Sequence, residues 1–189
     1  MKPFRSFVPS LAVMLLAASG GAMAEGVLID KSEIRFVSKA MGASVEGRFR
    51  RWKANVDFRP NDPGKSKANL EIELGSIDLA SDATEAEARR SAWFDTAKFP
   101  VATFASTAVR GLGGDRYEIA GTLAMKGVTK DIVVPMTLRK DSGGNAVADG
   151  QFTLKRLDFK IGEGEWADTS AVANDVVVRV RMVLPPVSQ

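Results

Sequence analysis

The chain has 189 residues, with 26 Lys and Arg against 23 Asp and Glu, and it contains neither histidine nor cysteine. The two absences exclude Ser–His–Asp and Cys–His catalysis, histidine or thiolate metal sites, and disulfide bonds. Only chemistry based on carboxylates, or plain binding, remains open.

The first 24 residues have the pattern of a signal peptide. Lys2 and Arg5 precede an apolar run, and Ala22-Met23-Ala24 has the small-x-small form of a cleavage site. The run is shorter than the roughly 20 residues of a membrane span. We expect cleavage after Ala24, no stable membrane span, and a single domain over 25–189. The mature chain then carries 24 basic and 23 acidic residues, and a net charge of +1 argues against nucleic-acid binding.

Alternation of apolar and polar residues dominates the chain after the leader. This period of two, with one polar face, is typical of an antiparallel sheet. Turn sequences separate the runs, among them Lys126-Gly127, which is typical of a tight hairpin. About eight strands at this spacing predict an all-β barrel or sandwich. The clearest runs are 52–59, 68–74, 117–125 and 175–184, with weaker ones at 34–38, 44–49 and 150–154.

One helix is expected within 81–94. Ser81 or Asp82 can cap it, Glu85 has the spacing of a capping box with Asp82, and Glu85 and Arg89 have the spacing of an ion pair. Its apolar positions are nearly all alanine before Trp93 and Phe94, so we expect a short surface helix that ends in aromatic residues.

The stretch WFDTAKFPVATFAST at 93–107 leads from this helix into a strand. Pro100 lacks an amide donor, which suits the start of a strand. Alternation then predicts that Phe104 and Ala108 share the inner face. The small and hydroxyl residues of this strand also suit an exposed pairing edge.

Carboxylates offer only weak candidates for catalysis. A glycosidase needs two facing carboxyl groups, and the available pairs are Glu71 with Glu73 and Glu163 with Glu165. The first pair lies on the polar face of an alternating strand, which is typical of a solvated surface. The loop EGEWADT at 163–169 lacks the dense acidic spacing of a calcium loop. We therefore expect no catalytic residues, no metal and no cofactor.

A basic cluster spans 48–53. Its guanidinium groups can hold phosphate, which makes Arg48, Arg50 and Arg51 candidates for an anion clamp at the mouth of an apolar cavity, where the charged headgroup of a ligand would lie. The alternative is a solvated turn.

Several segments in order resemble the YceI-like family of exported polyisoprenoid-binding proteins. They are WFDTAKFPVATFAST at 93–107, YEIAGTLAMKGVTKDIVVPM at 117–136, DGQFTLKRLDFKIG at 149–162 and NDVVVRVRMVL at 174–184. The resemblance covers nearly all of 25–184. It departs at 89–91, where many members have a histidine in the preceding helix and this chain has Arg-Arg-Ser.

The resemblance implies a closed, lipocalin-like antiparallel β-barrel that encloses an apolar cavity for an isoprenoid or other long-chain lipid, of the polyprenyl phosphate or quinone type. It also implies a non-enzymatic role in storage, transport or stress protection, and a periplasmic or secreted location. It is compatible with a homodimer. Two alternatives stay open, which are a structural or interaction module with a filled barrel and a carboxylate-based enzyme acting on lipid or sugar.

Alternation, taken with the resemblance, assigns sixteen residues to the lining of the cavity. They are Phe36, Phe49, Trp52, Val56, Phe58, Leu70, Ile72, Phe94, Phe99, Phe104, Ile119, Leu123, Phe152, Leu154, Phe159 and Val178.

Overall fold

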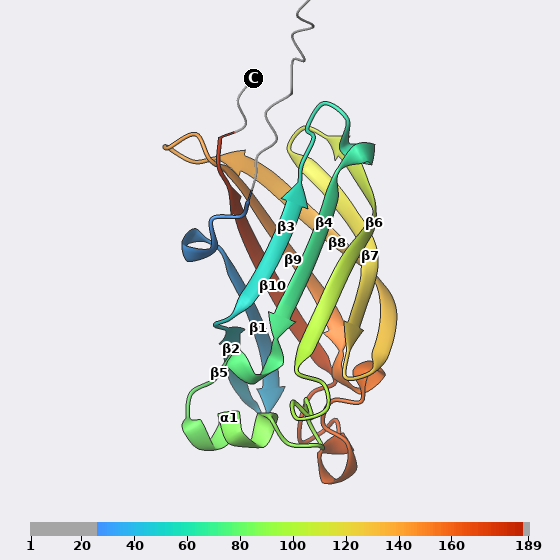
Figure 1. Ribbon diagram of the computed structural model, residues 1–189. Helices are drawn as coiled ribbons and strands as arrows, with labels where there is room; N and C mark the ends of the chain where they lie inside the picture. The colour runs from blue at the N-terminus through green and yellow to red at the C-terminus, as the bar shows by residue number, and fades with distance from the viewer. Residues whose placement is uncertain (1–25, 187–189) are drawn as a thin grey trace, which may run out of the picture.

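A computed structural model describes residues 26–186 of the chain. It is an all-β fold with one short α-helix, and its ten strands form one antiparallel sheet in the order β3-β4-β6-β7-β8-β9-β10-β1-β2-β5. The sheet curls into a half-barrel whose strands run obliquely (Figure 1). The strands are β1 (Glu33–Ala40), β2 (Ala43–Phe49), β3 (Trp52–Asp57), β4 (Lys67–Glu73), β5 (Ile77–Asp78), β6 (Val101–Gly113), β7 (Arg116–Met125), β8 (Val128–Lys140), β9 (Ala146–Lys155) and β10 (Asp175–Leu184).

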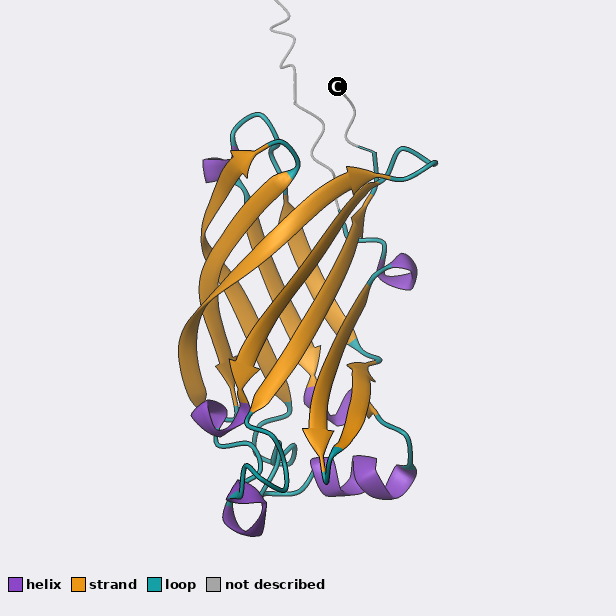
Figure 2. Ribbon diagram, turned by 180° about the vertical axis from the view of Figure 1, so that it is seen from behind, coloured by secondary structure: helices purple, strands orange, loops and turns teal. Residues whose placement is uncertain are grey.

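The helical elements gather mainly at one end of the sheet, below the strands in Figure 2. There α1 lies beside the loops that carry η3, η4 and η5, and the described ends of the chain lie at the opposite end. We call the first of these the α1 end. The helical elements are α1 (Asp82–Ala88), η1 (Ile29–Lys31), η2 (Pro63–Lys65), η3 (Leu74–Ser76), η4 (Arg156–Phe159) and η5 (Gly164–Ala167).

The sheet has ten strands rather than about eight because two chain segments bend sharply. Arg50 and Arg51 separate β2 from β3, and η3 separates β4 from β5. The two bends are hydrogen-bonded to each other, since the Arg50 amide donates to the Ser76 carbonyl and the Glu73 amide donates to the Arg51 carbonyl, both at 3.0 Å. Each bent segment therefore contributes two shorter strands.

Strand β6 differs from the expectation in two ways. It pairs with β4 on one side and β7 on the other, so it is not an exposed pairing edge. Its register also shifts between Ser106 and Ala108, a β-bulge that moves one residue out of the pairing. Ala108 consequently pairs with Ala120 on the outer face, and Val109 takes the inner position at 5% exposure. Simple alternation past Ser106 was wrong for this reason.

The helix is shorter than the expected segment and its cap differs. Helix α1 ends at Ala88, and Ser81 is its N-cap, accepting a hydrogen bond from the Thr84 amide. The capping box from Asp82 to Glu85 does not form, because the Glu85 carboxylate accepts from the Leu79 amide instead. The Glu85–Arg89 ion pair is present at 2.7 Å.

The Lys126-Gly127 turn is confirmed between β7 and β8. Both residues have positive φ, 49° and 73°, as a type I′ hairpin requires.

Candidate ligand-binding site

The concave face of the sheet holds an apolar pocket of about 180 Å³. Its walls come from every strand except β5, because the inward half of each alternating strand is apolar. Tyr117 is the one lining residue with a polar side-chain atom. The others are Ile34, Phe49, Val56, Phe58, Ala68, Leu70, Ile72, Leu74, Ala102, Phe104, Val109, Ile119, Leu123, Met125, Ile132, Val134, Met136, Leu138, Ala148, Phe152, Leu154, Val178, Val180, Met182 and Leu184.

A second pocket, of about 270 Å³, lies at the α1 end and is called here the α1-end pocket. Five residues line both pockets, so the two adjoin one another along the inner face. The shared residues are Ile34, Phe49, Met125, Leu154 and Val178.

Aromatic rings mark the passage between the pockets. The Phe49 ring lies 5.7 Å from that of Phe36 and 6.1 Å, edge-on, from that of Phe94. At the other end of the first pocket, Phe58 meets Tyr117 edge-on at 5.3 Å. Such tilted contacts are favourable aromatic geometries, and they stabilise the packing of the rings in the wall.

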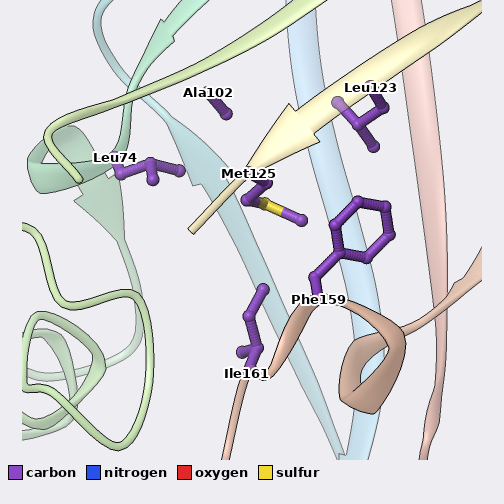
Figure 3. Packing of buried hydrophobic residues seen from close by; sticks show 6 residues of the cluster. All are labelled: Leu74, Ala102, Leu123, Met125, Phe159 and Ile161. Atoms are coloured by element: carbon purple, nitrogen blue, oxygen red, sulfur yellow. The ribbon is translucent and has the colours of Figure 1, made fainter. Parts of the chain in front are cut away.

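Most of the sixteen predicted lining residues lie on one or both pockets. Trp52, Phe99 and Phe159 do not. Trp52 packs in a core cluster with Ile34 and Met182, and Phe99 lies against the Lys126-Gly127 turn. Phe159, only 2% exposed, packs with Leu123 and Met125 as plain core (Figure 3). Contact between the remaining thirteen and a ligand stays a prediction.

Sequence reasoning missed two groups of lining residues. Met125, Met182 and Leu184 lie on the apolar faces that alternation identifies, so the pattern could have found them. Arg156 and Trp166 line the α1-end pocket from loops. No local pattern marks these two, because their neighbours are distant in the sequence. Trp93, expected at the aromatic end of the helix, lines the same pocket.

The basic cluster lies outside both apolar pockets. Arg48 and Arg50 both donate to the Asp78 carboxylate, at 2.6 and 2.5 Å, and Arg51 donates to Glu73 at 2.6 Å. The Arg50 and Arg48 hydrogen bonds lower the pKa of Asp78 to about 2. The structure thus uses these arginines in ion pairs on the outer surface, and their role as headgroup ligands stays a prediction without support from the geometry.

Arg156 organises the loops of the α1 end. Its side chain is 2% exposed and donates to five backbone carbonyls, those of Ile161, Gly162, Trp166, Val172 and Ala173. Its guanidinium also lies 5.8 Å from the centre of the Trp93 ring, which is 5.6 Å from the Trp166 ring. The burial of this charge lowers the pKa of Arg156.

Lys126 joins the same loops from the β7–β8 turn. Its buried amino group donates to the carbonyls of Ala92 and Lys160 and, at 3.2 Å, to the Glu163 carboxylate. The amides of Gly162 and Glu163 also donate to the Ala92 carbonyl, at 2.8 and 3.0 Å. Arg156 and Lys126 together fix the loops that close the α1-end pocket.

The carboxylate pairs do not form a site. Glu71 and Glu73 are exposed, and the hydrogen bond from Arg51 lowers the pKa of Glu73. Glu163 is paired with Lys126, and Glu165 is exposed. Within residues 26–186, no three acidic side chains gather closely enough to hold a metal ion. Over the same residues, no helix has the length and apolarity needed to cross a membrane.

The protein is thus a single-domain β-protein, in which a curled antiparallel sheet turns its apolar face inward and a short helix lies at one end. The chain belongs to the YceI-like family, since the YceI-like domain matches residues 27–184. The resemblance inferred from the sequence is confirmed.

Relatives and solved structures agree with this assignment. A UPF0312 protein of Pseudomonas savastanoi is 33% identical over 165 residues, covering 82% of this chain and 86% of its own. The crystal structure of Burkholderia cenocepacia BcnA has a TM-score of 0.80 at 35% identity, covering 83% of this chain and 98% of its own. A polyisoprenoid-binding domain from Saccharophagus degradans, implicated in plant cell wall breakdown, shares the fold with a TM-score of 0.67 at 19% identity, covering 87% and 99%.

Proposed function

We propose that the protein is an exported, non-enzymatic lipid-binding protein that holds a long-chain isoprenoid, of the polyprenyl phosphate or quinone type, inside the curled sheet. Storage, transport or stress protection of that lipid would be its role. The observation that carries the proposal is the pair of adjoining pockets, because the first is lined by apolar residues from nine strands and the second continues it.

Closure of the sheet into a barrel is part of the proposal. The bends of β2–β3 and β4–β5 are hydrogen-bonded to each other, so the strands at the two ends of the sheet belong to the same pair of chain segments. Taking each bent segment as one strand gives a ring of about eight strands. A barrel of that size is wide enough to hold one small ligand.

Isoprenoids are the proposed ligand class for two reasons. The structural relative from Saccharophagus degradans is a polyisoprenoid-binding domain. A prenyl chain also gains roughly 25 cal/mol for each Å² of apolar surface that it buries, so apolar walls suffice for binding. No catalytic group is needed for such binding, and the hydrogen bond from Arg51 lowers the pKa of Glu73, whereas a general acid needs a raised one.

Periplasmic or secreted location follows from the leader over 1–24, which lies outside both the described residues and the matched domain. We propose cleavage after Ala24. N-terminal sequencing of the exported protein should find Glu25 as the first residue, and recovery of the uncleaved chain would contradict this.

Native purification followed by lipid extraction and mass spectrometry tests the ligand. We expect a prenyl compound in near-stoichiometric amount. Protein that is fully folded, carries no lipid and takes up none from solution would favour the structural module with a filled interior. Light scattering of the same preparation measures whether the protein is the homodimer that the resemblance allows.

A further inference from the structure

Three arginines form one row across neighbouring strands on the outer face of the sheet. Arg35 of β1 pairs in register with Arg48 of β2 on one side and with Arg179 of β10 on the other. These strands lie side by side in Figure 1. The arginine side chains point away from the interior, because the alternate residues Phe36 and Val178 line the pockets. We call the three residues the arginine row.

The arginine row is unfavourable for the sheet by itself. Like charges directly opposite each other on neighbouring strands are destabilising, whereas opposite charges attract. A general excess of basic residues does not account for the row, since the chain has 26 Lys and Arg against 23 Asp and Glu. Three cations in register are therefore a candidate for binding an anion.

Each arginine of the row is held through one nitrogen atom. The Nε atom donates to a neighbouring side chain, which is Glu33 for Arg35 at 2.7 Å, Asp78 for Arg48 at 2.6 Å and Gln151 for Arg179 at 3.1 Å. Among residues 26–186, no hydrogen bond engages the Nη atoms of these three guanidinium groups. The row is thus fixed at its base and has free donors at its outer end.

A hollow of about 280 Å³ lies beside the row, and all three arginines line it. Two carboxylates lie in the same wall, those of Asp78 and Glu46. Asp78 already accepts hydrogen bonds from both Arg48 and Arg50. The cations around the hollow therefore outnumber the carboxylates, and the hollow favours a negatively charged occupant.

The geometry of guanidinium groups selects the kind of anion. Their planar fork of N–H donors matches the oxygens of phosphate and carboxylate groups. Neighbouring strands lie only about 4.8 Å apart, so two adjacent guanidinium groups can contact one molecule. Single contacts at an exposed surface are weak and are screened by salt. A ligand with two neighbouring phosphate groups consequently gains more than a singly charged anion.

We propose that the arginine row is a second binding site, which takes a phosphate-type oxyanion carrying at least two negative charges. Arg35, Arg48 and Arg179 donate to its oxygens through their Nη atoms, and the anion offsets the repulsion within the row. The site lies on the opposite face of the sheet from the apolar pockets, so it goes beyond the proposed function and does not depend on it. The phosphate belongs either to a soluble molecule or to the headgroups of a lipid surface, two sources that experiment distinguishes.

Calorimetric titration with inorganic pyrophosphate tests the site, in about 0.1 M salt, where the Debye length is about 10 Å. We expect the native protein to bind, and Arg179→Gln to bind about 5–10-fold more weakly. Arg110→Gln is the matched control, because Arg110 is an exposed arginine of β6 that pairs with Glu118, away from the row. It removes the same charge and should change the affinity less than about twofold.

A carboxylate in the hollow should act in the opposite direction. Glu46→Gln removes negative charge beside the row, and we expect it to tighten pyrophosphate binding about 2–5-fold. Glu71→Gln, at an exposed position of β4, should leave the affinity unchanged. Urea unfolding without anion gives a further measurement. Arg179→Gln should be as stable as the native chain or more so, because it relieves repulsion, whereas a purely structural role would make it less stable.

Vesicles that contain phosphatidylglycerol distinguish the two sources of phosphate. Binding to them that pyrophosphate displaces would identify a lipid surface, and binding to pyrophosphate alone would identify a soluble molecule. Absence of pyrophosphate binding, or an equal loss of affinity in Arg179→Gln and Arg110→Gln, would overturn the site. Copurified lipid should be the same in Arg179→Gln and the native chain, so failure of this site leaves the proposed function intact.

Discussion

At the scale of single residues, two glycines of the sheet lie where an aromatic ring covers them. The Phe36 ring lies over Gly47 of β2, and the Phe104 ring lies over Gly121 of β7. A Cβ atom at Gly121 would fall 2.5 Å from Phe104 Cζ. Neither glycine has a positive φ, so glycine is needed at these positions only because a side chain would collide with the ring. The missing Cβ atoms leave the space that the Phe36 and Phe104 rings occupy.

Gly47→Ala should therefore destabilise the protein. The new methyl group would collide with the Phe36 ring and lie 2.8 Å from Leu79 Cδ2. Overpacking of this kind costs about 1–3 kcal/mol, and urea unfolding would measure it. Gly75→Ala is the control, because a Cβ there meets nothing within 4 Å. Equal stability of the two variants would show that the Phe36 ring moves freely.

Arg156 is the residue on which the α1 end depends most. Arg156→Met would leave five backbone carbonyls without their donor, and we expect a loss of at least about 3 kcal/mol of unfolding free energy. Arg156→Lys keeps the charge but offers three donors rather than five. It should recover only part of the loss, whereas full rescue would mean that charge alone matters.

At the scale of elements, the β7–β8 turn links the sheet to the loops of the α1 end through Lys126. Lys126→Met should loosen those loops, because the amino group contacts both the Ala92 and the Lys160 carbonyl. Hydrogen exchange should become faster at the Gly162 and Glu163 amides. Amides in the middle of β10 should keep their protection, and Lys140→Met, at the exposed end of β8, should change neither.

The bend between β2 and β3 is pH-sensitive through Asp78. Its folded pKa of about 2 lies below the usual 3.8 because Arg50 and Arg48 donate to its carboxylate. A lowered pKa means that the ion pair contributes stability above about pH 4 and that this contribution is lost as the pH falls through 2.

Asp78→Asn tests this effect. The difference in urea midpoint between the native chain and Asp78→Asn should be constant near neutral pH and should shrink between pH 4 and 2. Added salt should reduce it, because the arginines are more than half exposed. Asp115→Asn, which removes a carboxylate with no ion pair among residues 26–186, should show no such trend. A difference that persists at pH 2 would mean that the carboxylate charge is not its source.

The sequence predicts an element well when the pattern that specifies it involves only residues that are neighbours along the chain. Alternation placed the inner faces of β3, β4, β7 and β10 correctly because a period of two needs only neighbouring residues. It failed in β6 at the bulge after Ser106, where one extra residue reverses the faces. Trp52 and Phe159 are as apolar as the residues that line the pockets. Only the packing of distant chain segments determines that these two lie in the core and not in a pocket wall.

The polar groups of the α1 end show the same limit more strongly. Arg156 and Lys126 read as ordinary surface charges in the sequence, but their partners lie up to 17 and 37 residues away. The cluster of arginines at 48–51 predicted an anion site. Its actual partners, Asp78 and Glu73, lie more than 20 residues away in the sequence, so local spacing did not predict these ion pairs either. Buried charge is fixed by tertiary contacts, so neither role follows from spacing.

At the scale of the whole molecule, a larger side chain placed on the inner face of the sheet should change the protein's stability in opposite directions if the interior is hollow or filled. Ala148 lies on β9 and lines the first pocket without being fully buried. If the pocket holds a lipid chain, Ala148→Phe should fill the space, reduce copurified lipid several-fold, and leave the lipid-free protein as stable as before or more so. If the interior is filled, the same ring must displace core side chains and should cost about 1–3 kcal/mol.

Ala105→Phe is the control, because Ala105 is exposed on the outer face of β6. It should change neither lipid content nor stability by much. Lipid mass spectrometry and urea unfolding of both variants decide the matter. A destabilised Ala148→Phe with undiminished lipid would place the ligand outside the first pocket, since a lipid chain in that pocket must occupy the space that the new ring takes.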